Sequence, residues 1–169
     1  MSELQDKLKA PFDPFDIEWR VQVAGKTQQG KLYAILVPYV TNRAIQERLD
    51  DACGVENWTN EFQYPTEKSV ICGISILIGD KWLTKWDGAE ETGIEAVKGG
   101  LSGAMKRSAV QWGIGRYLYK LDTAITTPQL DKPQDMGGYI MTQVNLEGRK
   151  ERIYFQRPKL PVWAIPKAD

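Results

Sequence analysis

The sequence of 169 residues has no histidine and only two cysteines, Cys53 and Cys72. Histidine is the most common general base near neutral pH and the most common protein ligand of zinc, so its absence removes both kinds of site. Two distant cysteines cannot complete a zinc site, and nucleophiles activated by histidine are excluded. The sequence therefore predicts a protein with no metal and no other cofactor.

Long apolar runs and a net charge are also missing. No apolar run reaches the length of about 18 residues that a membrane span needs, and the start of the chain, MSELQDKLKAPF, lacks the apolar centre of a signal peptide. Two thiols without a secretory signal indicate a reduced, cytoplasmic protein. The 22 basic residues balance the 22 acidic ones, so any site for an anion must come from local sorting of charge.

Hydrophobic periodicity predicts the first elements. Residues 2–9 are expected to form a short helix, followed by a hairpin of DIEWRVQVAG and KLYAILVPYV around the polar turn KTQQG. The segment TNRAIQERLDDACG is expected to be a helix that Thr41 or Asn42 caps and Gly54 ends.

A β-β-β-α unit is predicted next, with strands WTNEFQY, SVICGISILIG and KWLTKWDG, of which the second is the most apolar and therefore central. The third strand alternates between a lysine side and a tryptophan side, which is typical of a sheet packed on one side. A long helix over residues 94–112 follows, and a capping box over residues 92–95 precedes it. The predicted class is α+β, an antiparallel sheet with the long helix packed on it.

The last third of the chain is expected to be less regular. Residues 122–138 are predicted to be a loop punctuated by proline and glycine, followed by a hairpin of YIMTQVNL and ERIYFQRP. The segment KLPVWAIP, with Trp163, is expected to close the chain as a proline-rich extended arm. The length favours one domain over residues 1–169, with a core of 1–121 and an appendage of 122–169.

Positive charge is concentrated in one segment of this neutral chain. Between Ala96 and Leu121 there is no acidic residue, but there are five basic ones: Lys98, Lys106, Arg107, Arg116 and Lys120. Cations near a helix C-terminus are routine, because they complement the helix dipole. Cations beside aromatic residues such as Trp112 and Tyr119 also form grooves for single-stranded nucleic acid. Both interpretations stand on composition alone.

Acidic residues gather immediately before this helix: Asp87, Glu90, Glu91 and Glu95. They are interpreted as a solvated loop with helix-capping acids, as ligands of Mg²⁺ for phosphodiester cleavage, or as the counterpart of a neighbouring subunit's basic surface.

Three glycines, Gly99, Gly100 and Gly103, lie inside the predicted helix, where each costs roughly 1 kcal/mol relative to alanine. They predict the close approach of another backbone, from the same chain or from a neighbouring subunit.

The two blocks YVTNRAIQERLDDACGVENW (39–58) and AVKGGLSGAMKRSAVQWGIGRYLY (96–119), on either side of three strands, resemble the single-strand annealing recombinases related to eukaryotic Rad52. The phage Sak and bacterial DdrA branch is the most similar. The resemblance covers about residues 5–120, and the tail RPKLPVWAIP more loosely. It implies a protein that is not an enzyme and that anneals complementary DNA strands without ATP, in recombination and repair.

The same resemblance implies partners and site residues. The partners are single-stranded DNA, further copies of the chain in a ring or arc, and a single-strand binding protein or an exonuclease, in the cytoplasm or nucleoid of a bacterial cell. The family's arginine near its first-block helix matches Arg43, and its Lys-Arg pair matches Lys106 and Arg107. A further basic position of the eukaryotic pattern falls on Val110, so the expected groove is supplemented by other cations of this chain: Lys85, Lys98 and Arg116.

Two alternatives remain open at this stage. One is a protein that coats single-stranded DNA without annealing it. The other is a metal-dependent nuclease that uses the acidic cluster.

Overall fold

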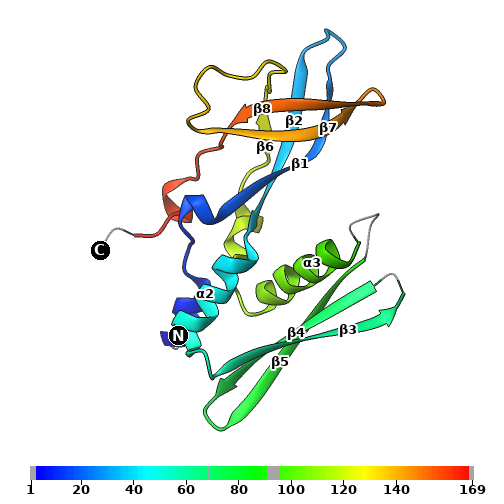
Figure 1. The fold of residues 1–169 in the computed structure, drawn as a ribbon. Helices are drawn as coiled ribbons and strands as arrows, with labels where there is room; N and C mark the ends of the chain where they lie inside the picture. The colour runs from blue at the N-terminus through cyan, green and yellow to red at the C-terminus, as the bar shows by residue number, and fades with distance from the viewer. Residues whose placement is uncertain (1–2, 68, 91–95, 168–169) are drawn as a thin grey trace. The chain divides into compact units, whose positions relative to one another are not determined.

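The computed structural model describes residues 3–67, 69–90 and 96–167, with the backbone alone at 89–90 and 96–98. Figure 1 shows the ribbon. The chain forms two compact units, each described here by itself. Unit 1 consists of Met1–Ile17, Val40–Lys120 and Trp163–Asp169, and unit 2 of Glu18–Tyr39 and Leu121–Val162. The predicted α+β class is confirmed, with antiparallel sheets and helices in the expected order.

Unit 1 is built around a three-stranded antiparallel sheet. Its strands are β3 (Trp58–Thr66), β4 (Ser69–Ile78) and β5 (Lys81–Glu90), in the order β3-β4-β5, so the most apolar strand is central as predicted. The long helix α3 (Ala96–Gln111) packs on β4 and β5. Alternate residues of β4 are fully buried and form the core on this side: Val70, Cys72, Ile74 and Ile76. Burial raises the pKa of the Cys72 thiol to about 11, so the thiol is protonated and unreactive.

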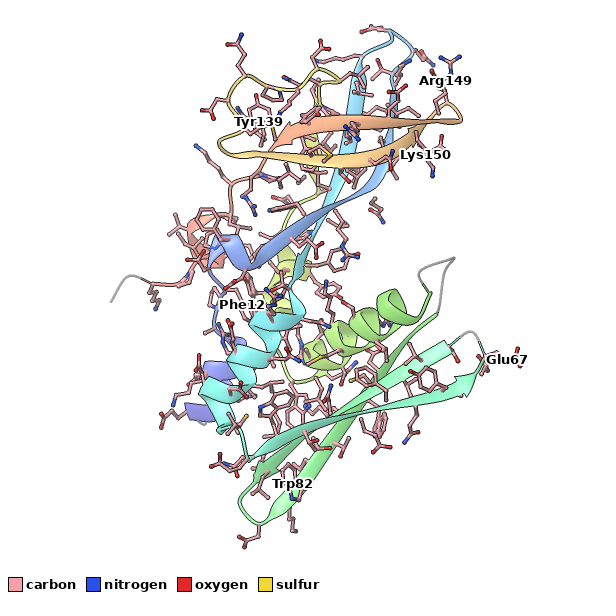
Figure 2. All side chains as sticks on the ribbon, in the orientation of Figure 1. Phe12, Glu67, Trp82, Tyr139, Arg149 and Lys150 are labelled. Carbon is pink, nitrogen blue, oxygen red and sulfur yellow. The ribbon has the colours of Figure 1, made fainter. Side chains whose placement is uncertain are left out.

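The helix covers the lysine side of β5. Lys85 lies opposite Ile74 in the register, and its Nζ lies 4.5 Å from the ring centroid of Trp112 at the end of α3. The predicted alternation is correct, and the open side is the one with Trp82 and Trp86, which are 50% and 38% exposed. Trp82 can be located near the β4–β5 turn in Figure 2.

The open face has a glycine under a tryptophan. Gly73 lies opposite Trp86, and a Cβ on Gly73 would lie 2.7 Å from the Trp86 ring. The ring therefore rests on the strand backbone, in a place where no other residue type fits.

Two helices complete the N-terminal half of unit 1. They are α1 (Glu3–Lys9) and α2 (Asn42–Cys53), with the 3₁₀ turn η1 (Pro14–Asp16) between them in sequence. Thr41 caps α2 as predicted, because its Oγ1 accepts the Ala44 N–H at 3.2 Å. Gly54 ends the helix with a φ of 85°.

Arg48 of α2 holds the N-terminal segment in place. Its guanidinium donates to the carbonyls of Lys7 at 3.1 Å, Ala10 at 2.6 Å and Pro11 at 3.2 Å. It also stacks on the Phe12 ring at 4.0 Å. One half-buried side chain therefore ties the end of α1 and the loop after it to α2.

Unit 2 contains two small sheets. One has the order β1-β2-β6, from β1 (Ile17–Lys26), β2 (Leu32–Val40) and β6 (Ala124–Thr126). The other is the predicted hairpin of β7 (Tyr139–Leu146) and β8 (Arg149–Gln156). The prediction of an unbroken loop over 122–138 was wrong at β6, which pairs antiparallel with β2. Three residues are too few to produce a periodic pattern, and only the backbone of β2 gives them a strand conformation.

The predicted capping box over 92–95 lies outside the described residues, which omit 91–95, so α3 is described from Ala96. The predicted extended arm contains a short 3₁₀ turn, η3 (Val162–Ala164), in which Ala164 is buried and Trp163 is half exposed. Within the described part of the chain, no helix has the length and apolar character that crossing a membrane would need.

Candidate nucleic-acid interface

The basic segment singled out in the sequence contains the C-terminal end of α3. Gly113 leaves the helix with a φ of 96°, and the Ile114 N–H donates to the carbonyl of Ala109 at 3.1 Å. This six-residue return is the Schellman ending, which requires a residue that tolerates a positive φ. Gly113 is therefore a helix stop. Its own N–H donates to the Val110 carbonyl at 3.0 Å, and side-chain donors add to these backbone bonds at the last turn.

Two cations supply those donors. Arg116, in the 3₁₀ turn η2 (Arg116–Lys120), donates from Nε and Nη2 to the Val110 carbonyl at 2.9 and 2.6 Å, and from Nη2 to that of Gln111 at 2.8 Å. Lys85 reaches the same Gln111 carbonyl from β5, with its Nζ at 3.0 Å. Both positive charges lie at the negative end of the helix dipole, where they are favoured.

A third cation is held one turn earlier on α3. Arg107 Nε donates to Asp87 Oδ1 at 3.0 Å, and Gln111 Nε2 donates to Asp87 Oδ2 at 2.9 Å. The buried Ser108 hydroxyl donates to the Lys85 carbonyl at 2.9 Å and fixes the helix against β5. Arg107 keeps 58% of its side chain exposed, so its terminal nitrogens remain open to a ligand.

Lys85, Arg107 and Arg116 thus meet around one residue, and we call this group the Gln111 cluster. Its positions come from β5, α3 and η2, and Asp87 is the one carboxylate bonded to it among the described residues. All three cations are exposed. Two arginines and a lysine that are held by hydrogen bonds and remain exposed can bind phosphate groups by charge-assisted hydrogen bonds.

The remaining predicted site residues lie elsewhere. Lys106 precedes Arg107 on α3 and is therefore rotated by about 100° from it around the helix axis. Its side chain is half-buried. Arg43 lies exposed in the first turn of α2, and within the described residues no hydrogen bond joins it to the Gln111 cluster. Lys98 lies in α3, but its side chain is outside the described residues. Sequence reasoning missed Gln111, although its spacing of four residues from Arg107 on a helix indicates a shared face.

The family model of the Rad52/22 family double-strand break repair proteins matches residues 1–136, which include α1 to β6 and the whole Gln111 cluster. The chain belongs to this family. The predicted relation to Rad52 is therefore confirmed.

Two relatives of this Rad52/22 family member are named single-stranded DNA-binding protein DdrA. The protein from Deinococcus radiodurans is 36% identical over 125 residues, which cover 72% of this chain and 57% of the relative. The protein from Deinococcus deserti is 33% identical over 130 residues, covering 72% and 59%. The expected likeness to the DdrA branch is confirmed, and the chain spans less than two thirds of the length of either relative.

The acidic cluster, for which a metal site was one of three interpretations, lies largely outside the described residues, since Glu91 and Glu95 belong to 91–95 and only the backbone of Glu90 is described. No group of three potential metal ligands occurs in the described part of this family member. The carboxylate of Asp87 is bonded to Arg107 and Gln111.

Asp87 gives the cluster a pH dependence. Partial burial raises the pKa of Asp87, but hydrogen bonds from Gln111, the Gly88 N–H and Arg107 outweigh it, so the pKa lies below the usual value of 3.8. A carboxyl with a lowered folded-state pKa adds stability above its unfolded-state pKa and loses it as the pH falls through its folded-state value.

We expect Asp87→Asn to lower the free energy of unfolding by at most about 1 kcal/mol at neutral pH, because the ion pair is partly exposed. The difference between the two proteins should shrink as the pH falls below about 3.8. Urea unfolding of the wild type and of Asp87→Asn, repeated from pH 7 downward, measures this difference in the free energy of unfolding. A difference that stays constant with pH would contradict this origin.

Proposed function

We propose that this chain binds single-stranded DNA and anneals complementary strands without ATP, in the recombination or repair of DNA in a bacterial cytoplasm or nucleoid. The observation that carries the proposal is the Gln111 cluster, where three cations from three separate elements converge within the family-matched region. The names of the DdrA relatives support the choice of ligand. In this proposal the protein is a binder and has no catalytic residues.

The chemistry of the cluster suits annealing. Lysine and arginine side chains grip phosphates and carry no information about base identity. A strand held by its phosphates leaves its bases open to pair with a complementary strand. The proposed groove contains the Gln111 cluster together with Lys106, Lys98 and Arg43. It binds DNA of any base sequence, because it contacts phosphates only.

Assembly completes the proposal. A neutral chain with a few cations per copy binds weakly alone, but many copies along one strand bind tightly through multivalency. We propose a large homo-oligomer in which different surfaces of neighbouring copies meet, so that contacts close into a ring or extend as an arc. We also propose that the oligomer works with a second protein, either a single-strand binding protein or an exonuclease.

The Lys106→Ala, Arg107→Ala double variant tests the groove. Each lost contact to single-stranded DNA lowers the slope of log affinity against log salt by roughly 0.7, so the slope should fall by about 1.4. The affinity should fall roughly tenfold near 0.15 M salt, equally for all sequences. Fluorescence anisotropy with labelled oligonucleotides in a salt series measures both quantities.

A matched control removes two exposed cations of unit 1 that lie outside the groove, Lys7→Ala and Lys167→Ala. This variant should keep the wild-type slope. Equal slopes for the groove variant and the wild type would place the DNA on another surface.

Mixing two complementary fluorescent strands with the wild-type protein tests the activity itself. Acceleration of duplex formation without ATP supports annealing, whereas tight binding without acceleration favours a coating protein. Shortening of the labelled strands in Mg²⁺ or Mn²⁺ would favour the nuclease.

A further inference from the structure

The hairpin β7–β8 has one face on which every polar side chain is a hydrogen-bond donor. Side chains on one strand alternate between faces, and directly opposed residues of two strands share a face. The register places Asn145 opposite Lys150 and Gln143 opposite Arg152. All four are exposed, and we call them the hairpin donor face.

The acidic residue of this hairpin strand points to the other side. Glu151 lies between Lys150 and Arg152 in sequence, so it belongs to the opposite face, where it lies opposite Val144 and is half-buried. The donor face therefore combines two cations with two amides and carries no carboxylate from either strand.

Further cations lie near the turn end of the hairpin, where Arg149 belongs to the face opposite Lys150 because it lies opposite Leu146 in the register. The β1–β2 turn meets the β7–β8 turn, since Lys26 Nζ lies 2.9 Å from Glu147 Oε2. Lys31 and Arg149 lie at the same two turns and are exposed. Figure 2 shows Arg149 and Lys150 at the end of the hairpin. Glu147 neutralises one cation, and within the described residues no ion pair involves Lys31, Arg149 or Lys150.

The spacing and composition fit a sugar-phosphate backbone. The two donor pairs are two residues apart along the strands, which is about 6.8 Å and comparable to the separation of successive phosphates on one strand. The turn residues Lys26 to Lys31 and Glu147 to Lys150 include no large apolar side chain that would anchor a folded protein. Amide and cationic donors together are what contacts to phosphate and sugar oxygens use.

We propose that the hairpin donor face is a second binding surface for the phosphate backbone of single-stranded nucleic acid. The hairpin follows the region that the family model matches, so the family assignment does not account for it. The inference rests on the proposed binding of single strands and adds a surface carried by different elements from those of the Gln111 cluster.

The test compares Lys150→Gln, Arg152→Gln with a control that removes the same charge from the same unit, Lys132→Gln, Lys159→Gln. All four cations are exposed, so equal melting temperatures are expected. Two experimental arms use labelled oligothymidylate. The first measures its affinity for the empty protein. The second measures its capture by protein that is already saturated with unlabelled oligothymidylate.

If the donor face binds the strand held elsewhere on the protein, the hairpin variant should lose roughly tenfold in affinity in the first arm near 0.15 M salt, with the salt slope reduced by about 1.4. If it binds a second strand, the same loss should occur in the second arm alone. The control should match the wild type in both arms. Either loss supports the proposal.

Wild-type values for the hairpin variant in both arms would overturn the inference while leaving the proposed function intact. Loss of binding to a polyglutamate peptide, with both DNA arms unchanged, would also overturn it and assign the face to an acidic protein. A wild-type protein that binds no oligothymidylate would instead refute the proposed function.

Discussion

A Trp112→Ala variant is expected to lose about 3–5 kcal/mol of the free energy of unfolding. The Trp112 ring is 7% exposed at the end of α3, and its Nε1 donates to the Ile74 carbonyl of β4 at 2.9 Å. Truncation leaves a cavity between helix and sheet, and it removes a buried hydrogen bond. It also removes the ring over which Lys85 lies, so the Gln111 cluster should loosen with the fold. Urea unfolding measures the loss.

Trp86→Ala is the matched control, because it removes the same side chain from the open face of the same sheet. Trp86 is 38% exposed, so its loss should be well below that of Trp112. Trp112→Phe should recover most of the stability while lacking the hydrogen bond. Equal losses for Trp112→Ala and Trp86→Ala would contradict the assignment of the packed face.

Gly99→Leu is expected to abolish assembly and, with it, annealing. Gly99 is exposed on α3, and a Cβ built on it meets no atom of the described residues within 4 Å. The described residues therefore leave space for a Cβ at this position, and leucine should favour the helix by up to about 1 kcal/mol. A neighbouring copy packed against this glycine would be displaced. Light scattering should then report about 19.2 kDa in place of several times that mass.

Gln46→Leu, also at an exposed helical position, is the control and should assemble normally. A Gly99→Leu protein that keeps the wild-type mass and annealing rate would show that neighbouring copies meet elsewhere. A lower melting temperature of the isolated chain would show instead that the substitution disturbs the fold.

Local sequence patterns predicted the elements whose signals are strong. The apolar composition of SVICGISILIG marked the central strand, and Thr41 marked the start of α2. Alternation cannot decide which face of a strand is covered. On β5 the lysine side is covered, because the long stem of Lys85 packs on Trp112 while its amine reaches a helix carbonyl.

The candidate site was predictable as a charge concentration but could not be resolved into contacts. Neighbours in sequence such as Lys106 and Arg107 point in different directions on a helix. Lys85 and Arg116 are 31 positions apart in sequence and meet at the Gln111 carbonyl only because the helix lies on β5. The role of Asp87 also required the fold, since the sequence left open a helix-capping acid, a metal ligand and a partner of a neighbouring subunit's basic surface, whereas the structure pairs it with Arg107.

The clamp made by Arg48 determines how the N-terminus can be shortened. Removal of the residues before Asp13 would take away the Phe12 ring and every carbonyl that this guanidinium contacts: Lys7, Ala10 and Pro11. Arg48 would lose these hydrogen bonds and the ring on which it stacks, and α2 would lose the segment that packs on it. A protease that cut this segment would therefore destabilise α2 as well. A shortened chain that keeps this clamp begins at or before Lys7.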